Sequence, residues 1–221
     1  MSAVEPRLIA ALQEQLRRRD ALLREGAGRI GWKLGMGERE RIGEHIAVGY
    51  LTTNTLIDAD DGYRAEPRVD RELHVDTELC IEFGKDINQG DDPDDVVAAI
   101  RHCWPALEIV DLSPRANEPD SVVVDNVFHQ AVAFGDKPIP MASDDQVMTY
   151  VNGRCVDRAP WPADLPDRIV NAVTVLASLN EWIRAGDRVI TGSITQLSFA
   201  PGDLLLARFG PRAAVAVKTV V

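Results

Sequence analysis

Apolar and polar residues alternate strictly over residues 74–83, which read HVDTELCIEF. The odd positions, from Val75 to Phe83, are apolar apart from Thr77, and the even positions contain three acids and a histidine. A period of two predicts a half-buried strand with its even positions on the outer face. The outer face of such a strand is normally solvated, so His74 and Glu82 are expected at the surface.

Helical signals mark three other stretches. Residues 6–25 repeat leucine near helical spacing and are followed by Gly26. Residues 91–105 predict a short helix, with Asp92 as its cap and Pro105 as its end. Residues 162–187 predict a second long helix whose apolar stripe continues to the glycine at 186.

Most of the remaining chain reads as strands. Residues 28–36 alternate large apolar side chains with Gly31, Lys33 and Gly35, so Lys33 is the one reactive side chain on a glycine-rich face. Further strands are predicted at 106–112, at 127–135 and in the C-terminal 35 or so residues, and Asn152-Gly153 is typical of a hairpin turn. Residues 113–126 read as a long loop. The pattern predicts a β-rich α+β fold with an N-terminal helix.

Composition narrows the class of protein. The 221 residues are 45% hydrophobic and have a net charge of −11, and the short basic run at 17–19 falls inside a predicted helix. A nucleic-acid binder would need a basic face, so nucleic acid is not an expected partner. No stretch has the roughly 18 apolar residues of a membrane span, and the N-terminus lacks the layout of a signal peptide, which predicts a cytoplasmic protein. Three scattered cysteines argue against a disulfide framework or a thiolate zinc site.

The acids offer candidate chemistry. Asp76 and Glu78 leave the same face of one strand, about 7 Å apart at Cα. Glu108 lies in the apolar strand sequence ALEIVD, where an unpaired buried carboxylate needs a cation or a proton. Three carboxylates on neighbouring strands would hold Mg²⁺ and leave positions for a chelating substrate. The alternatives are a solvated acidic face and an ion pair between Glu108 and Lys33 or an arginine.

Other residues have weaker signals. Lys33 is either exposed or functional, as a cation that neutralises a substrate carboxylate or enolate or as an acid/base group with a lowered pKa. Glu44 and His45 lie in the polar segment 37–47, where a lid or a general base could sit. The turn GSIT at 192–195 offers N–H groups and hydroxyls to an anion, although simple turn chemistry explains it as well.

Six blocks of the sequence, in order, resemble the 2-keto-4-pentenoate hydratase family of the fumarylacetoacetate hydrolase superfamily. The blocks are GWKLGM, TELCIEFGKDI, WPALEIVD, VVDNVF, VITGSITQ and PGDLLLARFG. The resemblance implies a mixed β-barrel or roll with peripheral helices, and a division into an N-terminal helical extension (1–27) and a catalytic domain (28–221).

The resemblance also implies site residues. Mg²⁺ or Mn²⁺ would be held by Asp76, Glu78 and Glu108, where the family usually has a glutamate in place of Asp76. Lys33 matches the family lysine. The implied substrate contacts are Ser193 and Thr195, together with Asp125 and Asn126, which match a family Asp-Asn pair near the site.

The activity that the resemblance implies is hydration of a 2-hydroxy-2,4-dienoate to a 4-hydroxy-2-oxo acid. The candidate water-activating bases are Glu44 and His45. The alternatives are decarboxylation of a 2-oxo acid of the 4-oxalocrotonate type, C–C hydrolysis of an acylpyruvate, for which a Glu-His pair is expected, and a non-catalytic partner subunit. The resemblance further implies a homo-oligomer.

Overall fold

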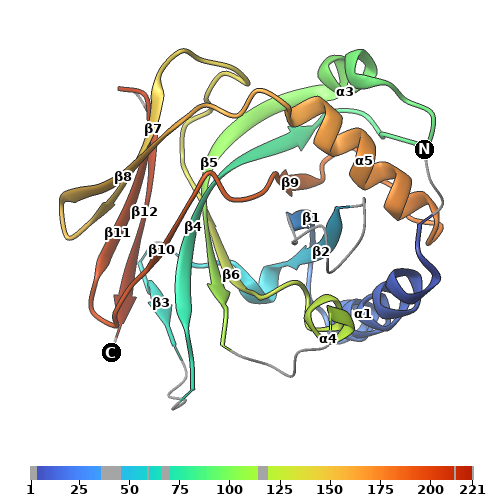
Figure 1. The fold of residues 1–221 in the computed structure, drawn as a ribbon, viewed down its shortest axis with the longest axis horizontal. Coiled ribbons are helices and arrows are strands. Elements are labelled where there is room, and N and C mark those ends of the chain that lie inside the picture. The colour runs from blue at the N-terminus through green and yellow to red at the C-terminus, as the bar shows by residue number, and fades with distance from the viewer. Residues whose placement is uncertain are drawn as a thin grey trace.

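The chain forms two β-sheets, with helices packed against one end of the larger sheet (Figure 1). The computed structural model describes residues 4–35, 46–58, 60–65, 70–113, 119–211 and 213–220. Within these ranges the larger sheet has seven strands: β1 (Arg29–Gly35), β2 (Ala47–Thr52), β4 (Leu73–Phe83), β5 (Ile100–Asp111), β6 (His129–Phe134), β9 (Arg188–Ile190) and β10 (Thr195–Ser198). The smaller sheet, over the same ranges, has five: β3 (Tyr63–Arg64), β7 (Gln146–Val151), β8 (Arg154–Pro160), β11 (Leu204–Phe209) and β12 (Ala213–Val220). The helices are α1 (Pro6–Arg24), α3 (Pro93–Ala99), α4 (Pro119–Val124), α5 (Leu165–Ala177) and the 3₁₀ turn η1 (Thr53–Thr55).

The larger sheet curls into a barrel-like roll. Its strand order is β2-β1-β9-β4-β5-β6, and β10 pairs with β4. Just after β2, Leu56 forms a bridge to Val132 of β6, and the N–H of Ile57 donates to the carbonyl of Val132 at 2.8 Å. The chain that leaves one edge strand therefore returns to the opposite edge strand, which encloses one face of the sheet.

The enclosed face has its own small apolar cluster. It contains fully buried side chains from β2, β4, β5, β6 and β9, namely Leu51, Cys80, Ala106, Val132 and Ile190. Alternation along β4 and β5 places Asp76, Glu78 and Glu108 on this same face. The strand periodicity predicted from the sequence thus points the acids into the roll and not toward solvent.

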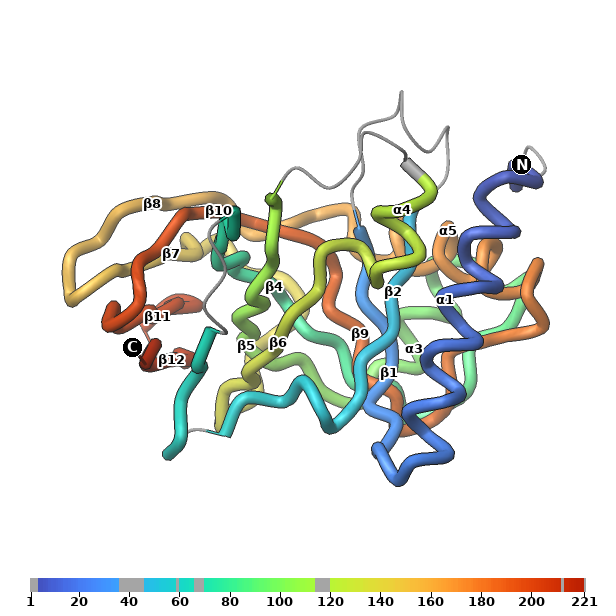
Figure 2. Tube along the Cα trace, turned by 90° about the horizontal axis from the view of Figure 1, so that it is seen from below, coloured from blue at the N-terminus to red at the C-terminus, as the bar shows by residue number. Residues whose placement is uncertain are grey.

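The smaller sheet packs against β5 and β6 through β11 and β12 (Figure 2). Where the sheets meet, the buried hydroxyls of Thr77 (β4), Thr149 (β7) and Thr195 (β10) form a chain, with oxygen–oxygen distances of 2.8 and 2.6 Å. Within the smaller sheet, the predicted Asn152-Gly153 turn joins β7 to β8, and both of its residues have positive φ. Positive φ at both positions is what a two-residue hairpin turn requires.

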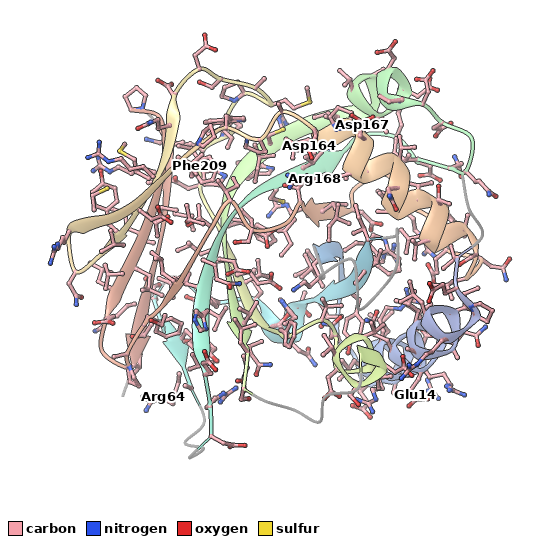
Figure 3. All side chains as sticks on the ribbon, in the orientation of Figure 1. Glu14, Arg64, Asp164, Asp167, Arg168 and Phe209 are labelled. Carbon is pink, nitrogen blue, oxygen red and sulfur yellow. The ribbon has the colours of Figure 1, made fainter. Side chains whose placement is uncertain are left out.

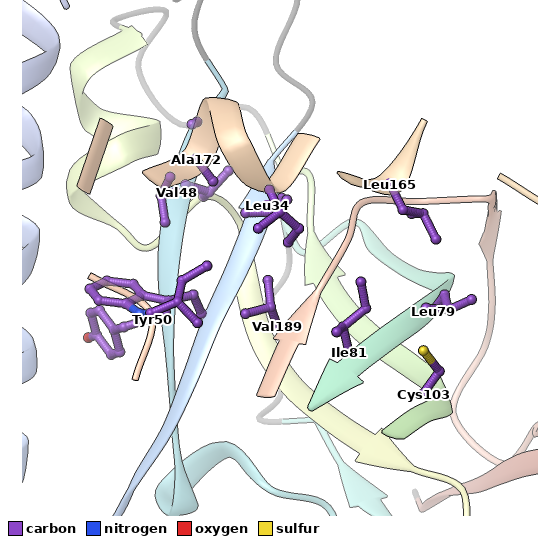
Figure 4. Packing of buried hydrophobic residues seen from close by; sticks show 14 of the residues in the cluster. Leu34, Val48, Tyr50, Leu79, Ile81, Cys103, Leu165, Ala172 and Val189 are labelled. Carbon is purple, nitrogen blue, oxygen red and sulfur yellow. The ribbon is translucent and has the colours of Figure 1, made fainter. Parts of the chain in front are cut away.

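Helix α5 covers the outer face of the larger sheet (Figure 4). Its buried side chains, among them Leu165 and Ala172, lie in the same core cluster as Leu79, Ile81 and Val189 of the strands. Part of the main core therefore lies between α5 and the face of the sheet that points away from the acids.

Helix α1 packs on α4 and β2 and belongs to the same core cluster through Leu8, Leu12 and Leu16. The buried amide of Gln15 donates to Val48 of β2 at 3.1 Å and to Val123 of α4 at 2.6 Å. The division of the chain at residue 27 remains a prediction.

The predicted helix over 91–105 is wrong in its second half. Asp92 does cap α3, through a reciprocal capping box with Asp95. The helix ends at Ala99, however, and residues 100–111 pair with β4 along its full length. The long antiparallel pairing outweighs the local helical pattern. Pro105 lies inside β5, opposite Gly135 and just past the end of β6, where its missing N–H interrupts no ladder.

Two further boundaries differ from the sequence prediction. Helix α5 ends at Ala177, well before residue 186, because Asn180 takes a left-handed conformation with φ 57°. The N–H groups of Asn180 and Glu181 then donate to the carbonyls of Ala177 and Leu176, the pattern of a Schellman cap. The loop predicted over 113–126 contains the short helix α4.

The β-rich α+β fold class is confirmed. No helix in the described ranges combines the length and the hydropathy that crossing a membrane would require.

Candidate metal centre

Three acidic side chains meet on the enclosed face of the larger sheet. Asp76 and Glu78 are two residues apart on β4, and Glu108 lies on β5 directly opposite Asp76. Residues two apart on a strand share a face, as do residues paired across strands, so the pairing brings the carboxylates together. All three residues are 6% exposed or less, and one oxygen from each lies within 4.8 Å of the other two. Asp76 is therefore long enough to join the cluster.

The electrostatics of the cluster suit a bound cation. Burial, and then the charge of Glu108, raises the pKa of Asp76 to about 7. The same two causes raise the pKa of Glu78 well above its usual range. Oδ1 of Asp76 is buried without a hydrogen-bond partner among the described residues, which is costly unless a cation or a proton occupies the position. Hard divalent cations prefer carboxylate oxygens, so the donor set fits such an ion.

Two donors orient the acids on β4. The N–H of Gly192 donates to Oε2 of Glu78 at 2.8 Å, and the side-chain amide of Gln196 donates to Oδ2 of Asp76 at 3.2 Å. The GSIT turn thus does offer an N–H to an anion, but the anion is Glu78. Gln196 pairs with Asp76 across β10 and β4 and so shares its face. Each donor engages one oxygen of its acid and leaves the other for a cation.

Helix α5 anchors the segment that carries Gly192. Figure 3 shows Arg168 near the start of this helix, beside Asp164. The Arg168 guanidinium pairs with Asp164 at 2.9 Å and donates to the carbonyl of Thr191 at 3.0 Å. Thr191 is itself held to β4, since its hydroxyl donates to the carbonyl of Leu79 at 2.9 Å. These bonds fix the residue that precedes Gly192.

Lys33 lies beside the acids as a buried cation. It is paired in register with Gly49 of β2 and with Ile190 of β9, and its side chain is 4% exposed. Its ammonium lies 2.6 Å from Oε1 of Glu108 and donates to the carbonyl of Val127 at 2.8 Å. Lys33 is thus neither exposed nor separate from the acids, and one of its three N–H bonds remains for another acceptor.

A left-handed turn leads into β6. Asn126, Val127 and Phe128 have φ values of 61°, 52° and 65°. This conformation is uncommon outside glycine and is an outlier for a β-branched residue, with a cost of order 1 kcal/mol each. The turn directs the Val127 carbonyl to Lys33, and the Phe128 carbonyl accepts from the N–H of Asp111 at 3.0 Å. The backbone strain therefore lies in the turn whose Val127 carbonyl accepts from the buried ammonium of Lys33.

His129, the first residue of β6, is, like Gln196, a site residue that the sequence did not single out. Its ring is buried, with Nδ1 2.7 Å from Oε1 of Glu108 and Nε2 2.9 Å from Oγ1 of Thr55. Its pKa is lowered below the usual value, because the effect of burial exceeds the opposing effect of Glu108. The signal in the sequence was weak: a histidine between two apolar stretches, with no spacing that links it to Glu108.

The residues predicted to contact the substrate do not form one cluster. Ser193 follows Gly192, is exposed and donates to the carbonyl of Thr195 at 2.9 Å. Thr195 pairs in register with Thr77, so its side chain leaves the face opposite to the acids and joins the threonine chain between the sheets. Ser193 is therefore adjacent in sequence to a donor to Glu78, whereas the Thr195 side chain lies on the other face of the sheet.

The predicted Asp-Asn pair is also divided. Asp125 pairs with Arg18 of α1 at 2.8 Å. The side chain of Asn126 is buried, accepts from the N–H of Tyr50 at 2.8 Å and donates to its carbonyl at 3.0 Å. Asn126 lies close to Lys33, because a Cβ at Gly49 would lie 2.6 Å from Lys33 Cγ and 2.7 Å from Asn126 Oδ1. Asn126 thus supports Lys33 and β2.

Two surface assignments for β4 are wrong. Glu82 is 14% exposed, pairs with Arg188 at 3.2 Å and accepts from the indole N–H of Trp104 at 3.2 Å. The side chain of His74 is only 16% exposed. The even face of β4 is enclosed by the roll, which alternation alone does not reveal. The candidate bases Glu44 and His45 lie outside the described residues.

Comparisons with known proteins show which proteins share this fold. No family model matches the chain. The chain nevertheless shares its fold with solved structures of the fumarylacetoacetate hydrolase type. A protein from Yersinia pestis CO92 that is described as a member of that family aligns with a TM-score of 0.57 and 15% identity, over 87% of this chain and 94% of that one. Maleylpyruvate hydrolase from Sphingobium sp. SYK-6 aligns with a TM-score of 0.62 and 17% identity, over 96% of this chain and 85% of that one. The fold implied by the sequence resemblance is confirmed.

A more particular likeness is to 4-oxalocrotonate decarboxylase. The enzyme from Pseudomonas putida G7, complexed with calcium and acetate, aligns with a TM-score of 0.82 and 22% identity, over 96% of this chain and 85% of that one. A curated 4-oxalocrotonate decarboxylase from Pseudomonas sp. is 26% identical over 197 residues, with 81% of this chain and 74% of that protein covered. By sequence and by fold, the chain is therefore similar to 4-oxalocrotonate decarboxylases, as the resemblance read from its sequence leads one to expect.

Proposed function

We propose that the chain is a divalent-metal-dependent enzyme that holds Mg²⁺ or Mn²⁺ on Asp76, Glu78 and Glu108. The observation that carries this proposal is the convergence of three buried carboxylates beside a buried lysine. The partnerless Oδ1 of Asp76 gives the cation an oxygen that no described donor uses. The decarboxylase from Pseudomonas putida G7 has been solved with magnesium and adipate, which supports a magnesium site in this fold.

The substrate class that suits the site is a 2-oxo or 2-hydroxydienoic acid. A bound divalent cation supplies a Lewis acid for the carboxylate and the 2-oxygen of such a chelating substrate. Lys33 contributes a fixed positive charge and one N–H that neither Glu108 nor Val127 uses. That N–H stabilises negative charge that develops on the 2-oxygen. The acids and Lys33 are buried, which strengthens the interaction.

The reaction that we favour is decarboxylation of a 2-oxo diacid of the 4-oxalocrotonate type. The C–C bond to the distal carboxylate breaks, CO₂ leaves, and the electron pair moves through the conjugated chain to the 2-oxygen. This reaction needs an electron sink but no base to activate water. Within the described ranges, the histidine beside the acids is His129, and both of its ring nitrogens are already engaged. Similarity to the decarboxylases supports the same choice.

Hydration of a 2-hydroxy-2,4-dienoate is the second candidate. The six ordered sequence blocks support it, and it shares the same stabilised 2-oxygen. It also requires a water-activating base, for which Glu44 and His45 remain the candidates. The same Glu-His pair would serve acylpyruvate hydrolysis. Ser193 is our candidate for contact with the substrate carboxylate. A homo-oligomer remains an expectation from the resemblance, and gel filtration with light scattering would detect it.

A product analysis separates these reactions. The purified protein is incubated with Mg²⁺ or Mn²⁺ and, in turn, with 4-oxalocrotonate, a 2-hydroxy-2,4-dienoate and an acylpyruvate, and the products are identified. Release of CO₂ from the diacid is the expected result, whereas a 4-hydroxy-2-oxo acid from the dienoate would identify a hydratase. Pyruvate released from the acylpyruvate would identify a C–C hydrolase. No turnover on any substrate would favour a non-catalytic partner subunit.

The metal centre is tested separately from the reaction. Glu108→Gln is expected to lower Mn²⁺ affinity by at least tenfold in calorimetric titration, since it replaces a charged ligand. Glu82→Gln is the matched control, because Glu82 is an acid on the same enclosed face that pairs with Arg188. Equal affinity in the Glu108 variant and the wild type would refute the proposed ligand set.

A further inference from the structure

We propose that His129 and Thr55 form a positioning pair that fixes the rotation of the Glu108 carboxylate, so that Oε1 is held by protein donors and Oε2 is presented to the cation. The inference rests on the proposed metal centre and goes beyond it, because neither residue is one of the proposed ligands. It starts from two contacts, His129 Nδ1 to Glu108 Oε1 at 2.7 Å and His129 Nε2 to Thr55 Oγ1 at 2.9 Å.

The first contact fixes the position of one proton. Oε1 of Glu108 already lies 2.6 Å from the Lys33 ammonium, which can only donate. An oxygen in that position accepts, so the proton between Glu108 and His129 belongs to Nδ1 of the histidine. This assignment holds for either charge state of the ring, because Nδ1–H is present in both the imidazolium and one neutral tautomer.

The second contact selects that tautomer. A neutral ring with its proton on Nδ1 has a bare Nε2, which needs a donor because the ring is buried. The Thr55 hydroxyl is within reach of Nε2 at 2.9 Å and of the Thr52 carbonyl at 3.1 Å, and it has one proton to give. Donation to His129 satisfies the ring. Without this hydroxyl, the bare Nε2 would be buried with no donor, so the ring would lose the contact that holds its Nδ1–H against Glu108.

The two contacts together fix the orientation of the Glu108 carboxylate. Lys33 and His129 approach the same oxygen from β1 and from the start of β6, so rotation of the carboxylate would break two charge-assisted contacts at once. Partners of this kind orient metal ligands, and their loss commonly lowers metal affinity 10- to 100-fold. His129 and Thr55 therefore act through Glu108 and do not contact the reacting atoms themselves.

Two pairs of variants test the proposal. Thr55→Val removes the hydroxyl with little change of shape, and Thr55→Ser restores it. His129→Leu removes the donor to Glu108, and His129→Asn keeps an N–H near the position of Nδ1. Mn²⁺ affinity is measured by electron paramagnetic resonance for each variant, and the tautomer of His129 is read from ¹⁵N chemical shifts of ring-labelled, metal-free protein.

The expected result is a loss of Mn²⁺ affinity of about tenfold or more in Thr55→Val and His129→Leu, with recovery in Thr55→Ser and partial recovery in His129→Asn. The ¹⁵N spectrum should show a protonated Nδ1 and a hydrogen-bonded, bare Nε2 in the wild type, and a bare Nε2 without its hydrogen bond in Thr55→Val. Wild-type affinity in Thr55→Val and His129→Leu would overturn the inference while leaving the metal centre intact. A wild type that binds no Mn²⁺ would overturn both. A wild-type ring with Nε2 protonated and Nδ1 bare would overturn the inference alone, whatever the metal affinities.

Discussion

Replacement of Lys33 by methionine isolates the energetics of the buried site. Methionine preserves much of the side-chain volume and removes the charge. The substitution leaves Glu108 without its cation and the Val127 carbonyl without its donor. Both residues are buried, Glu108 on β5 and Val127 in the strained turn before β6, so no solvent is at hand to replace the ammonium.

The size of the effect follows from the pKa of Glu108. Burial raises this pKa, but Lys33 and then His129 outweigh burial and lower it from 4.5 to about 2. At about 1.4 kcal/mol per pKa unit, the lowering is equivalent to about 3 kcal/mol of stability at neutral pH. That contribution is present above pH 4.5 and is lost as the pH falls toward 2. Loss of one partner from a buried pair typically costs about 3–5 kcal/mol, which is the loss expected for Lys33→Met at pH 7.5.

The pH dependence distinguishes a buried charge from a packing defect. Without Lys33, burial is expected to raise the pKa of Glu108 above 4.5, so the folded variant gains stability when the pH falls below that new value. The stability difference from the wild type should therefore be about 2 kcal/mol smaller at pH 5 than at pH 7.5. Urea denaturation in metal-free buffer at the two pH values measures it. Lys85→Met, at an exposed lysine, is the control and should change stability by less than about 0.5 kcal/mol. An equal loss at both pH values, or a loss below about 1 kcal/mol at pH 7.5, would refute the reasoning.

Three further predictions concern the metal centre and the backbone. Burial, and then Glu108, raises the pKa of Asp76 from 3.8 to about 7, so a cation must displace a proton from Asp76 below that pH. Mn²⁺ affinity should therefore fall about tenfold for each pH unit below 7. A calorimetric affinity that is flat from pH 5.5 to 8 would contradict this prediction. In the metal-free protein, the raised pKa of Asp76 contributes stability that is complete below pH 3.8 and is lost as the pH rises through 7. Saturating Mn²⁺ should therefore raise Tm more at pH 8 than at pH 5.5. Gly49→Ala would place a Cβ 2.6 Å from Lys33 Cγ and should destabilise the protein by about 1–3 kcal/mol in urea denaturation, whereas Gly84→Ala, where the nearest atom is 3.4 Å away, should be nearly neutral.

The acids were accessible from the sequence because their signals are local. Alternation put Asp76 and Glu78 on one face, and the apolar neighbours of Glu108 marked it as an acid with an unusual environment. Whether that face is wet is not a local property. The closing contact between Leu56 and Val132 encloses it, and these residues are far apart in the sequence.

The role of His129 was not accessible in this way. It depends on a left-handed turn that contains Val127 and Phe128, residue types that no propensity rule places at positive φ. The turn is imposed by contacts with distant parts of the chain, including the hydrogen bonds of Asn126 to Tyr50. The overlong prediction for α3 has a similar cause, since pairing with β4 overrides a pattern that is helical when read alone.

The ion pair of Lys33 also bears on the valence of the ion that the proposed metal site would hold. When ionised, Asp76, Glu78 and Glu108 together with Lys33 leave two negative charges in an enclosed volume, and a neutral His129 does not alter that count. A divalent cation brings the total to zero, whereas a monovalent ion leaves one charge uncompensated and a trivalent ion adds one. Uncompensated charge is expensive away from water. The lysine therefore tunes the site to doubly charged ions before ionic radius or coordination geometry has any influence.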